Sequence, residues 1–144
     1  MVRFWDSSAI VPMLVPEPSS ATVRTVFESD PEVTVWWTTG VECSGALARL
    51  ERESAISAPD MLDALDRLDA LALSWREVQP VARLRPVAVR LLRTHSLRAA
   101  DALQLAAART ASEDRPDTLP FVTLDERLAL AAQREGFEVI RPAP

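Results

Sequence analysis

The alternation of short apolar segments with amphipathic helical segments is the feature that most restricts the fold of this 144-residue chain. Strand-like segments cover residues 2–5, 32–37, 75–81, 121–124 and 137–140. Helical patterns separate them, over residues 8–14, 19–29, 38–54, 57–73, 86–95, 97–110 and 125–136. This order predicts one three-layer α/β domain over residues 1–144, with a central parallel sheet flanked by helices. In such sheets a ligand crevice lies at the carboxyl ends of the strands.

Several helix boundaries carry specific signals. Ser57 and Asp60 have the spacing of a capping box, in which each side chain bonds the other residue's backbone N–H. Pro86 is expected to open one helix, since proline is tolerated in a first turn. Ser96 is expected to cap the next helix, and Gly136 to end the last one.

The composition excludes several kinds of chemistry. All 16 cationic side chains are arginine, so a P-loop and Schiff-base catalysis are excluded for want of a lysine. The three glycines lie too far apart for a dinucleotide-binding fingerprint. A single histidine, His95, cannot build a multi-histidine metal site, and a single cysteine, Cys43, excludes an internal disulfide framework. Carboxylates remain as the reactive groups.

Charge is distributed unevenly along the chain. Residues 1–69 hold five arginines against twelve acidic residues, a net charge of −7, whereas residues 70–144 hold eleven against nine, a net charge of +2. An arginine-rich segment, residues 76–98, could receive a phosphate chain or could form a solvated helix face. No apolar run has the length of a membrane span and no secretion signal is evident, so the cytoplasm is the expected compartment.

Four acidic residues fall where the predicted crevice should lie. Asp6 closes the first strand and Asp125 follows the strand over residues 121–124. Glu42 and Asp101 lie in the first turns of their helices, where the positive end of the helix dipole tolerates an anion. Four carboxylates from four separate segments could therefore converge on one edge of the sheet.

Convergent carboxylates favour a divalent cation. At about 4 Å and an effective dielectric near 20, each pair of like charges costs roughly 4 kcal/mol. Mg²⁺ or Mn²⁺, which prefer oxygen ligands, would remove that cost. A cation held in this way can lower the pKa of a water molecule and polarise a phosphoryl oxygen, so phosphodiester hydrolysis would need no histidine.

Four stretches carry a resemblance to a known family: DSSAIV at 6–11, VECSGALAR at 41–49, LRAADALQLAAA at 97–108 and FVTLDERLALAAQREGFEVI at 121–140. In this order and spacing they resemble the PIN-domain family and, within it, the ribonuclease toxins of VapBC toxin–antitoxin modules. The resemblance implies a parallel-sheet PIN fold, an endoribonuclease dependent on Mg²⁺ or Mn²⁺, a homodimer and a cognate antitoxin. An arginine or lysine of that antitoxin is expected to reach the acidic site.

The resemblance also implies residue roles. One or two divalent ions would be held, directly or through waters, by Asp6, Glu42, Asp101 and Asp125. Ser7 and Thr123 would be polar helpers that orient water or substrate phosphate. From the charge distribution, and not from the resemblance, arginines of the C-terminal half, Arg98 among them, are expected to steer the RNA.

Other interpretations stay open. Asp101 could pair with Arg98 three residues earlier, and Asp125 could cap the following helix while also serving the site. The acids could instead dock a basic partner peptide without any cleavage. A phosphoryl-transfer protein is a further alternative, because such proteins also have aspartates at strand ends. Those proteins use a lysine near the phosphoryl group, and this chain has none.

The remaining distinctive residues are given structural roles. Four aspartates at three-residue spacing are expected on a solvated helix face: Asp60, Asp63, Asp66 and Asp69. Cys43 is expected to be a small buried residue and His95 to end a helix. Trp36 and Trp37 are expected in a strand, with at most one of them exposed.

Overall fold

A five-stranded, fully parallel sheet forms the centre of the molecule, in the order β3-β2-β1-β4-β5. The computed structural model describes residues 2–144. The strands are β1 (Arg3–Trp5), β2 (Val33–Trp36), β3 (Arg76–Val78), β4 (Phe121–Val122) and β5 (Val139–Ile140). Phe4 of β1 is in register with Thr34 on one side and Phe121 on the other.

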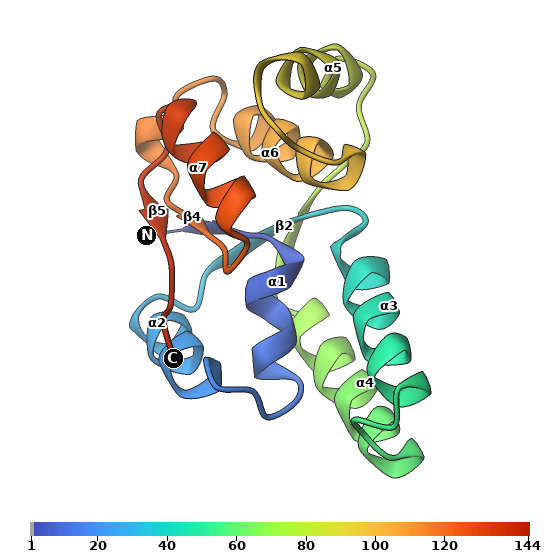
Figure 1. Ribbon diagram of the computed structural model, residues 1–144. Coiled ribbons are helices and arrows are strands. Elements are labelled where there is room, and N and C mark those ends of the chain that lie inside the picture. Colours follow the sequence, from blue (N-terminus) through green and yellow to red (C-terminus); the bar gives the residue numbers. More distant parts are fainter. Residues whose placement is uncertain (1) are drawn as a thin grey trace.

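Helices cover both faces of this sheet (Figure 1). One layer contains α5 (Leu84–Thr94), α6 (Ala99–Ala111) and α7 (Glu126–Arg134). The other contains α1 (Ser7–Ile10), α2 (Ser20–Ser29), α3 (Thr39–Arg52) and α4 (Ala58–Ala72). Short 3-10 turns follow α1 and α6, η1 at Val11–Met13 and η2 at Pro116–Thr118. The predicted three-layer α/β fold is confirmed.

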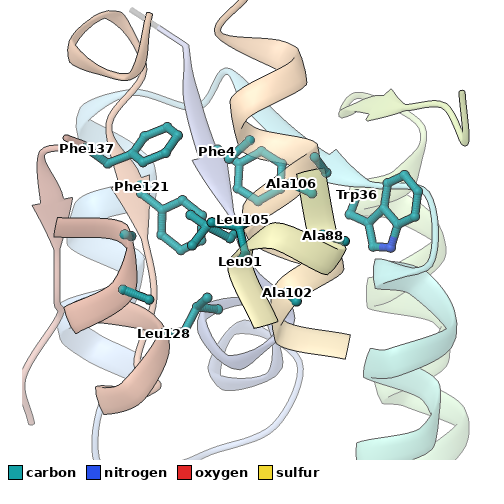
Figure 2. Close-up of a cluster of buried hydrophobic side chains, with 14 of the residues drawn as sticks. Phe4, Trp36, Ala88, Leu91, Ala102, Leu105, Ala106, Phe121, Leu128 and Phe137 are labelled. Atoms are coloured by element: carbon teal, nitrogen blue, oxygen red, sulfur yellow. The ribbon is translucent and has the colours of Figure 1, made fainter. Parts of the chain in front are cut away.

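Alternate strand side chains build two separate cores. Phe4 and Phe121 point towards the α5–α6–α7 layer and stack with ring centroids 5.3 Å apart (Figure 2). Their chain neighbours Trp5 and Val122 belong to the core on the opposite face. This two-residue alternation is the geometry of a strand buried on both sides.

The alanine-rich helix α6 lies inside the first of these cores. Ala102, Leu105 and Ala106 are fully buried beside Leu91 of α5 (Figure 2). Burial explains why this helix contains so few polar residues, and its small side chains allow α5 and the sheet to approach it closely.

Local signals predicted some helix starts correctly and others wrongly. The Ser57–Asp60 capping box is present, with N···O distances of 3.2 and 3.3 Å. Helix α5 begins at Leu84, two residues ahead of Pro86. A proline is tolerated in this first turn because the N–H that it lacks would have no partner within the helix. Helix α6 is preceded by Arg98 as N-cap, not by Ser96, and begins two residues later than predicted.

No helix within residues 2–144 combines the length and the apolar character needed to cross a bilayer.

Candidate acidic site at the carboxyl edge of the sheet

A cleft of about 530 Å³ lies where the first turns of α6 and α7 meet the starts of α1 and α3. Its lining residues are Ser7, Glu42, Arg98, Ala100, Asp101, Asp125, Glu126 and Arg127. The structure thus brings five of the predicted site residues to one cleft. Asp6 and Thr123 are buried and are not part of its lining.

Asp6 follows β1 directly and is only 3% exposed. Burial raises the pKa of its carboxyl to about 7, and the nearby charge of Asp125 adds to the rise. Hydroxyls of Ser8 and Thr123 act in the opposite direction, because they donate hydrogen bonds to the charged form. The Ser8 hydroxyl donates to Asp6 Oδ1 at 2.7 Å. Asp6 therefore carries a charge that the protein only partly offsets.

A chain of hydroxyls links the ends of β1 and β4. Ser8 Oγ accepts the backbone N–H of Leu124 at 2.9 Å and lies 3.2 Å from Thr123 Oγ1. Thr123 Oγ1 in turn accepts the N–H of Asp125 at 3.0 Å. These contacts fix Asp6 relative to Asp125. Ser8 was not among the predicted site residues, although it follows Ser7 directly after the first acid.

Glu42 accepts three hydrogen bonds from neutral donors. Ser7 Oγ donates to Oε1 at 3.0 Å, and Thr38 Oγ1 donates to Oε2 at 2.7 Å. Gln104 Nε2 donates to Oε1 at 2.9 Å from the facing helix α6. Thr38 and Gln104 were not predicted; the available signals were a threonine at the helix start and a lone amide in an apolar helix.

Asp101 is half-buried at the start of α6. Burial raises the pKa of its carboxyl, and the charges of Asp125 and Glu42 raise it further. The backbone N–H and the charge of Arg98 oppose this rise. The Asp101–Arg98 ion pair offered as an alternative is not formed among the described side chains.

Asp125 is the N-cap of α7. Its Oδ1 accepts the N–H of Leu128 at 2.8 Å, as the capping interpretation predicted. The second carboxyl oxygen leaves Asp125 able to contribute to the cleft as well. Asp125 therefore serves the helix start while lying on the wall of the cleft.

The oxygen atoms at this edge suit a hard divalent cation in their chemistry. Carboxylates and hydroxyls are the ligands that Mg²⁺ and Mn²⁺ prefer, and the raised pKa values of Asp6 and Asp101 indicate negative charge that lacks full compensation. However, in the described part of the chain no three His, Cys, Asp or Glu side chains are arranged to hold one ion. Glu42 accepts three hydrogen bonds and Asp125 accepts one at its cap, and both carboxylates keep lone pairs that an ion could use without displacing these donors.

The residues assigned structural roles behave as predicted, except that Trp37 lies in the turn after β2 and not in the strand. Cys43 is buried, and burial raises the pKa of its thiol to about 12. Trp36 lies in the core whereas Trp37 is 52% exposed. The aspartates at positions 60, 63, 66 and 69 are all exposed. His95 follows the last residue of α5, and its Nε2 lies 2.7 Å from Glu135 Oε2.

The fold and the cleft together define a class of protein: a three-layer α/β domain with acidic residues gathered at the carboxyl edge of a parallel sheet. The chain belongs to the PIN domain family: the family model matches residues 3–134. PIN domains are generally nucleases. A comparison with curated protein sequences finds no significant match.

Solved structures with this fold include FitAcB from Neisseria gonorrhoeae, with 19% identity, a TM-score of 0.67, and coverage of 99% of this chain and 98% of that one. A structure of FitAB bound to an IR36 DNA fragment gives 19% identity, a TM-score of 0.67, and coverage of 99% and 95%. PAE2754 from Pyrobaculum aerophilum has 21% identity, a TM-score of 0.59, and coverage of 90% and 84%. At these identities the likeness establishes the fold.

Proposed function

We propose that this protein is a divalent-metal-dependent endoribonuclease, the toxin of a VapBC-type toxin–antitoxin module acting in the cytoplasm. The observation that carries the proposal is the meeting of Glu42, Asp101 and Asp125 in one cleft, beside the buried Asp6, in a member of the PIN family. Acids from separate elements gain nothing from such proximity unless a cation or a cationic partner binds there.

Each residue has a role in this proposal. Mg²⁺ or Mn²⁺ would be held by Asp6, Glu42, Asp101 and Asp125. When bound, the ion supplies charge neutralisation, water activation and polarisation of the phosphodiester. Ser7 orients water or phosphate from the cleft wall, and Thr123 acts from behind it by fixing Asp6 and the start of α7.

The RNA would approach through the arginines at the rim. Arg98 and Arg127 both line the cleft, and neither is engaged in an ion pair with another described residue. Their guanidinium groups are therefore free to bind phosphates on either side of the reacting one. This arrangement explains how a protein with net charge −5 could bind a polyanion at one place.

The direct test is cleavage of a total RNA pool in chelator, in Mg²⁺ and in Mn²⁺, beside an Asp6→Asn variant. Cleavage that requires the metal and is lost in the variant supports the proposal. A folded protein that binds the metal and cleaves no RNA under any of these conditions would contradict it. Oligomeric state measured in the same preparations tests the proposed homodimer.

A second candidate is a binding module whose acids dock a basic peptide. The gathering of Glu42, Asp101 and Asp125 in one cleft supports it as well, because a guanidinium group can neutralise carboxylates as a metal ion does. The same cleft would then bind the basic segment of an antitoxin without hydrolysis. Peptide binding by a protein that does not cleave RNA in Mn²⁺ would favour this second function.

A further inference from the structure

Gln104 is a buried amide in an otherwise apolar helix. Its side chain is 1% exposed, and its neighbours on α6 from Leu105 to Ala108 are alanine or leucine that are fully buried. Burial of an amide without hydrogen bonds costs several kcal/mol in general, so its partners decide why it is there. Those partners lie on α3, across the cleft from α6.

The orientation of the amide is set by Glu42. Gln104 Nε2 donates to Glu42 Oε1 at 2.9 Å and to Thr39 Oγ1 at 3.0 Å. A carboxylate can only accept, so the NH₂ group must face Glu42 and the carbonyl oxygen must face away. That oxygen, Gln104 Oε1, is buried and has no partner among the described residues. The amide is therefore oriented to bind Glu42, and its own carbonyl oxygen is left without a hydrogen bond.

Water can replace the other two donors to Glu42, but it cannot readily replace Gln104. Ser7 and Thr38 are partly exposed, so water can take the place of either hydroxyl. Gln104 and Thr39 are buried, and water would not readily reach the gap left by a shorter or apolar side chain. Among the three donors, Gln104 of α6 is therefore the one that fixes the position of the Glu42 carboxylate.

Asp101 and Gln104 are three residues apart on α6 and so project from neighbouring positions on one face. Glu42 and Asp101 both line the cleft, so their carboxylates face the same space. Like charges that share this space repel each other. A hydrogen bond between α6 and Glu42 opposes that repulsion.

We propose that Gln104 is a positioning residue that holds the Glu42 carboxylate opposite Asp101 and so sets the separation of two oxygen donors for the cation. This inference rests on the proposed metal-dependent function. Gln104 touches neither substrate nor ion and acts only through Glu42. Its loss should weaken metal binding more than it weakens the fold.

The test compares Gln104→Leu with Gln133→Leu, the same change at an exposed glutamine of α7. Mn²⁺ titrations followed by thermal melting measure metal affinity independently of cleavage. For Gln104→Leu we expect metal affinity and the cleavage rate to fall by about 10–100-fold, as is typical when a ligand loses its supporting hydrogen bond. KM for RNA should stay unchanged, and Gln133→Leu should match the parent in all three measurements. Gln104→Asn keeps the amide, but its shorter side chain cannot reach Glu42, so its metal affinity should fall by the same factor. This variant takes the place of Gln104→Leu if the leucine variant does not fold.

A double-mutant cycle with Glu42→Ala tests the route of the effect. If Gln104 acts through Glu42, Gln104→Leu should change Mn²⁺ affinity little once Glu42 is gone. Equal losses in both backgrounds, or parental Mn²⁺ affinity in Gln104→Leu and Gln104→Asn, would overturn the inference. A parent that neither binds Mn²⁺ nor cleaves RNA would instead refute the proposed function, so the two failures are distinct.

Discussion

Asp6 is the residue at which burial and charge conflict most strongly. It is almost inaccessible to solvent, and two hydroxyls are its main compensation in the absence of a cation. Burial raises the pKa of its carboxyl to about 7 from an ordinary value of 3.8. The protonated form therefore favours folding, and the ionised form that would bind a metal opposes it.

We expect Asp6→Asn to raise the free energy of unfolding in chelator at alkaline pH. The gain should approach about 4 kcal/mol above pH 7, since one pKa unit corresponds to about 1.4 kcal/mol. The parent loses this penalty as the pH falls from 7 towards 3.8, so the advantage of the variant should shrink over the same range. Denaturant melts of both proteins across that range measure it. A gain that does not depend on pH would contradict an ionised Asp6.

Replacing Asp101 should change the stability of the metal-free protein in the opposite direction from the replacement of an ordinary acid at a helix start. Asn at this position still accepts the Arg98 N–H while it removes a charge that Asp125 and Glu42 repel. In chelator, Asp101→Asn should therefore be as stable as the parent or more stable, whereas loss of an ordinary capping acid costs up to about 1 kcal/mol. In Mn²⁺ the variant should gain less stability than the parent, and RNA cleavage should collapse.

Asp66→Asn is the matched control for this prediction, because Asp66 is exposed on α4 away from the cleft. It should change neither the response to Mn²⁺ nor cleavage. An Asp101→Asn protein that is clearly less stable in chelator and still cleaves RNA at the parental rate would remove Asp101 from the site.

At the scale of elements, Glu135 joins the three helices of one layer. Arg90 of α5 donates to Glu135 Oε1 at 2.9 Å, and Arg109 of α6 donates to the same oxygen at 3.2 Å. His95 Nε2 contacts Oε2 at 2.7 Å. These contacts fix α5 and α6 against the end of α7, and α6 in turn carries Asp101 and Gln104. The cluster thus supports the cleft from outside it.

Replacing Glu135 should destabilise the fold in a pH-dependent way. Burial alone would raise the pKa of Glu135, but hydrogen bonds and charges of Arg90 and His95 outweigh it and lower the pKa below 4.5. A lowered pKa stabilises the fold above the unfolded value, and this contribution is lost as the pH falls through the folded value. Glu135→Gln should cost about 1–3 kcal/mol at neutral pH, and less under acid conditions. Thermal and denaturant melts measure the cost, with the exposed Glu138→Gln as control.

The sequence predicted the elements well because each has a local cause. Two-residue alternation marks the strands, and the Ser57–Asp60 box begins a helix whatever surrounds it. The predicted starts of α5 and α6 were each wrong by two residues, because a local capping signal does not by itself fix where a helix begins. Neither helix has a side-chain hydrogen bond at its N-cap, so Ser96 does not cap α6.

At the scale of the whole molecule, four acids could be foreseen at one edge because strand ends and helix starts share a place in a parallel sheet. The contacts that hold those acids could not. The bonds Ser8–Leu124 and Gln104–Glu42 join residues far apart in sequence, and only the packing of β4 beside β1 and of α6 beside α3 creates them. The sequence therefore indicates the charges, and the tertiary fold decides their orientation.

The same edge of the molecule should bind either a metal ion or a basic peptide, and not both at full strength. A guanidinium group forms paired hydrogen bonds to a carboxylate and offsets its charge, so a short arginine-containing peptide should bind the cleft in chelator. Mn²⁺ neutralises the same oxygens and should weaken peptide binding. By linkage, the peptide must weaken Mn²⁺ binding by the same factor.

Two titrations measure this competition: peptide affinity at rising Mn²⁺, and Mn²⁺ affinity at rising peptide. Peptide binding in chelator should weaken in Asp6→Asn, which removes a buried charge behind the cleft, and in Asp101→Asn, which removes one from its lining. It should be unchanged in Asp66→Asn. Mn²⁺ at a hundredfold excess over its Kd should add about 2.7 kcal/mol to the stability of the free protein, and less when peptide is present. Peptide affinity that is indifferent to Mn²⁺ and to both substitutions would place the peptide on another surface, and control by a basic partner segment would then not act through the acids.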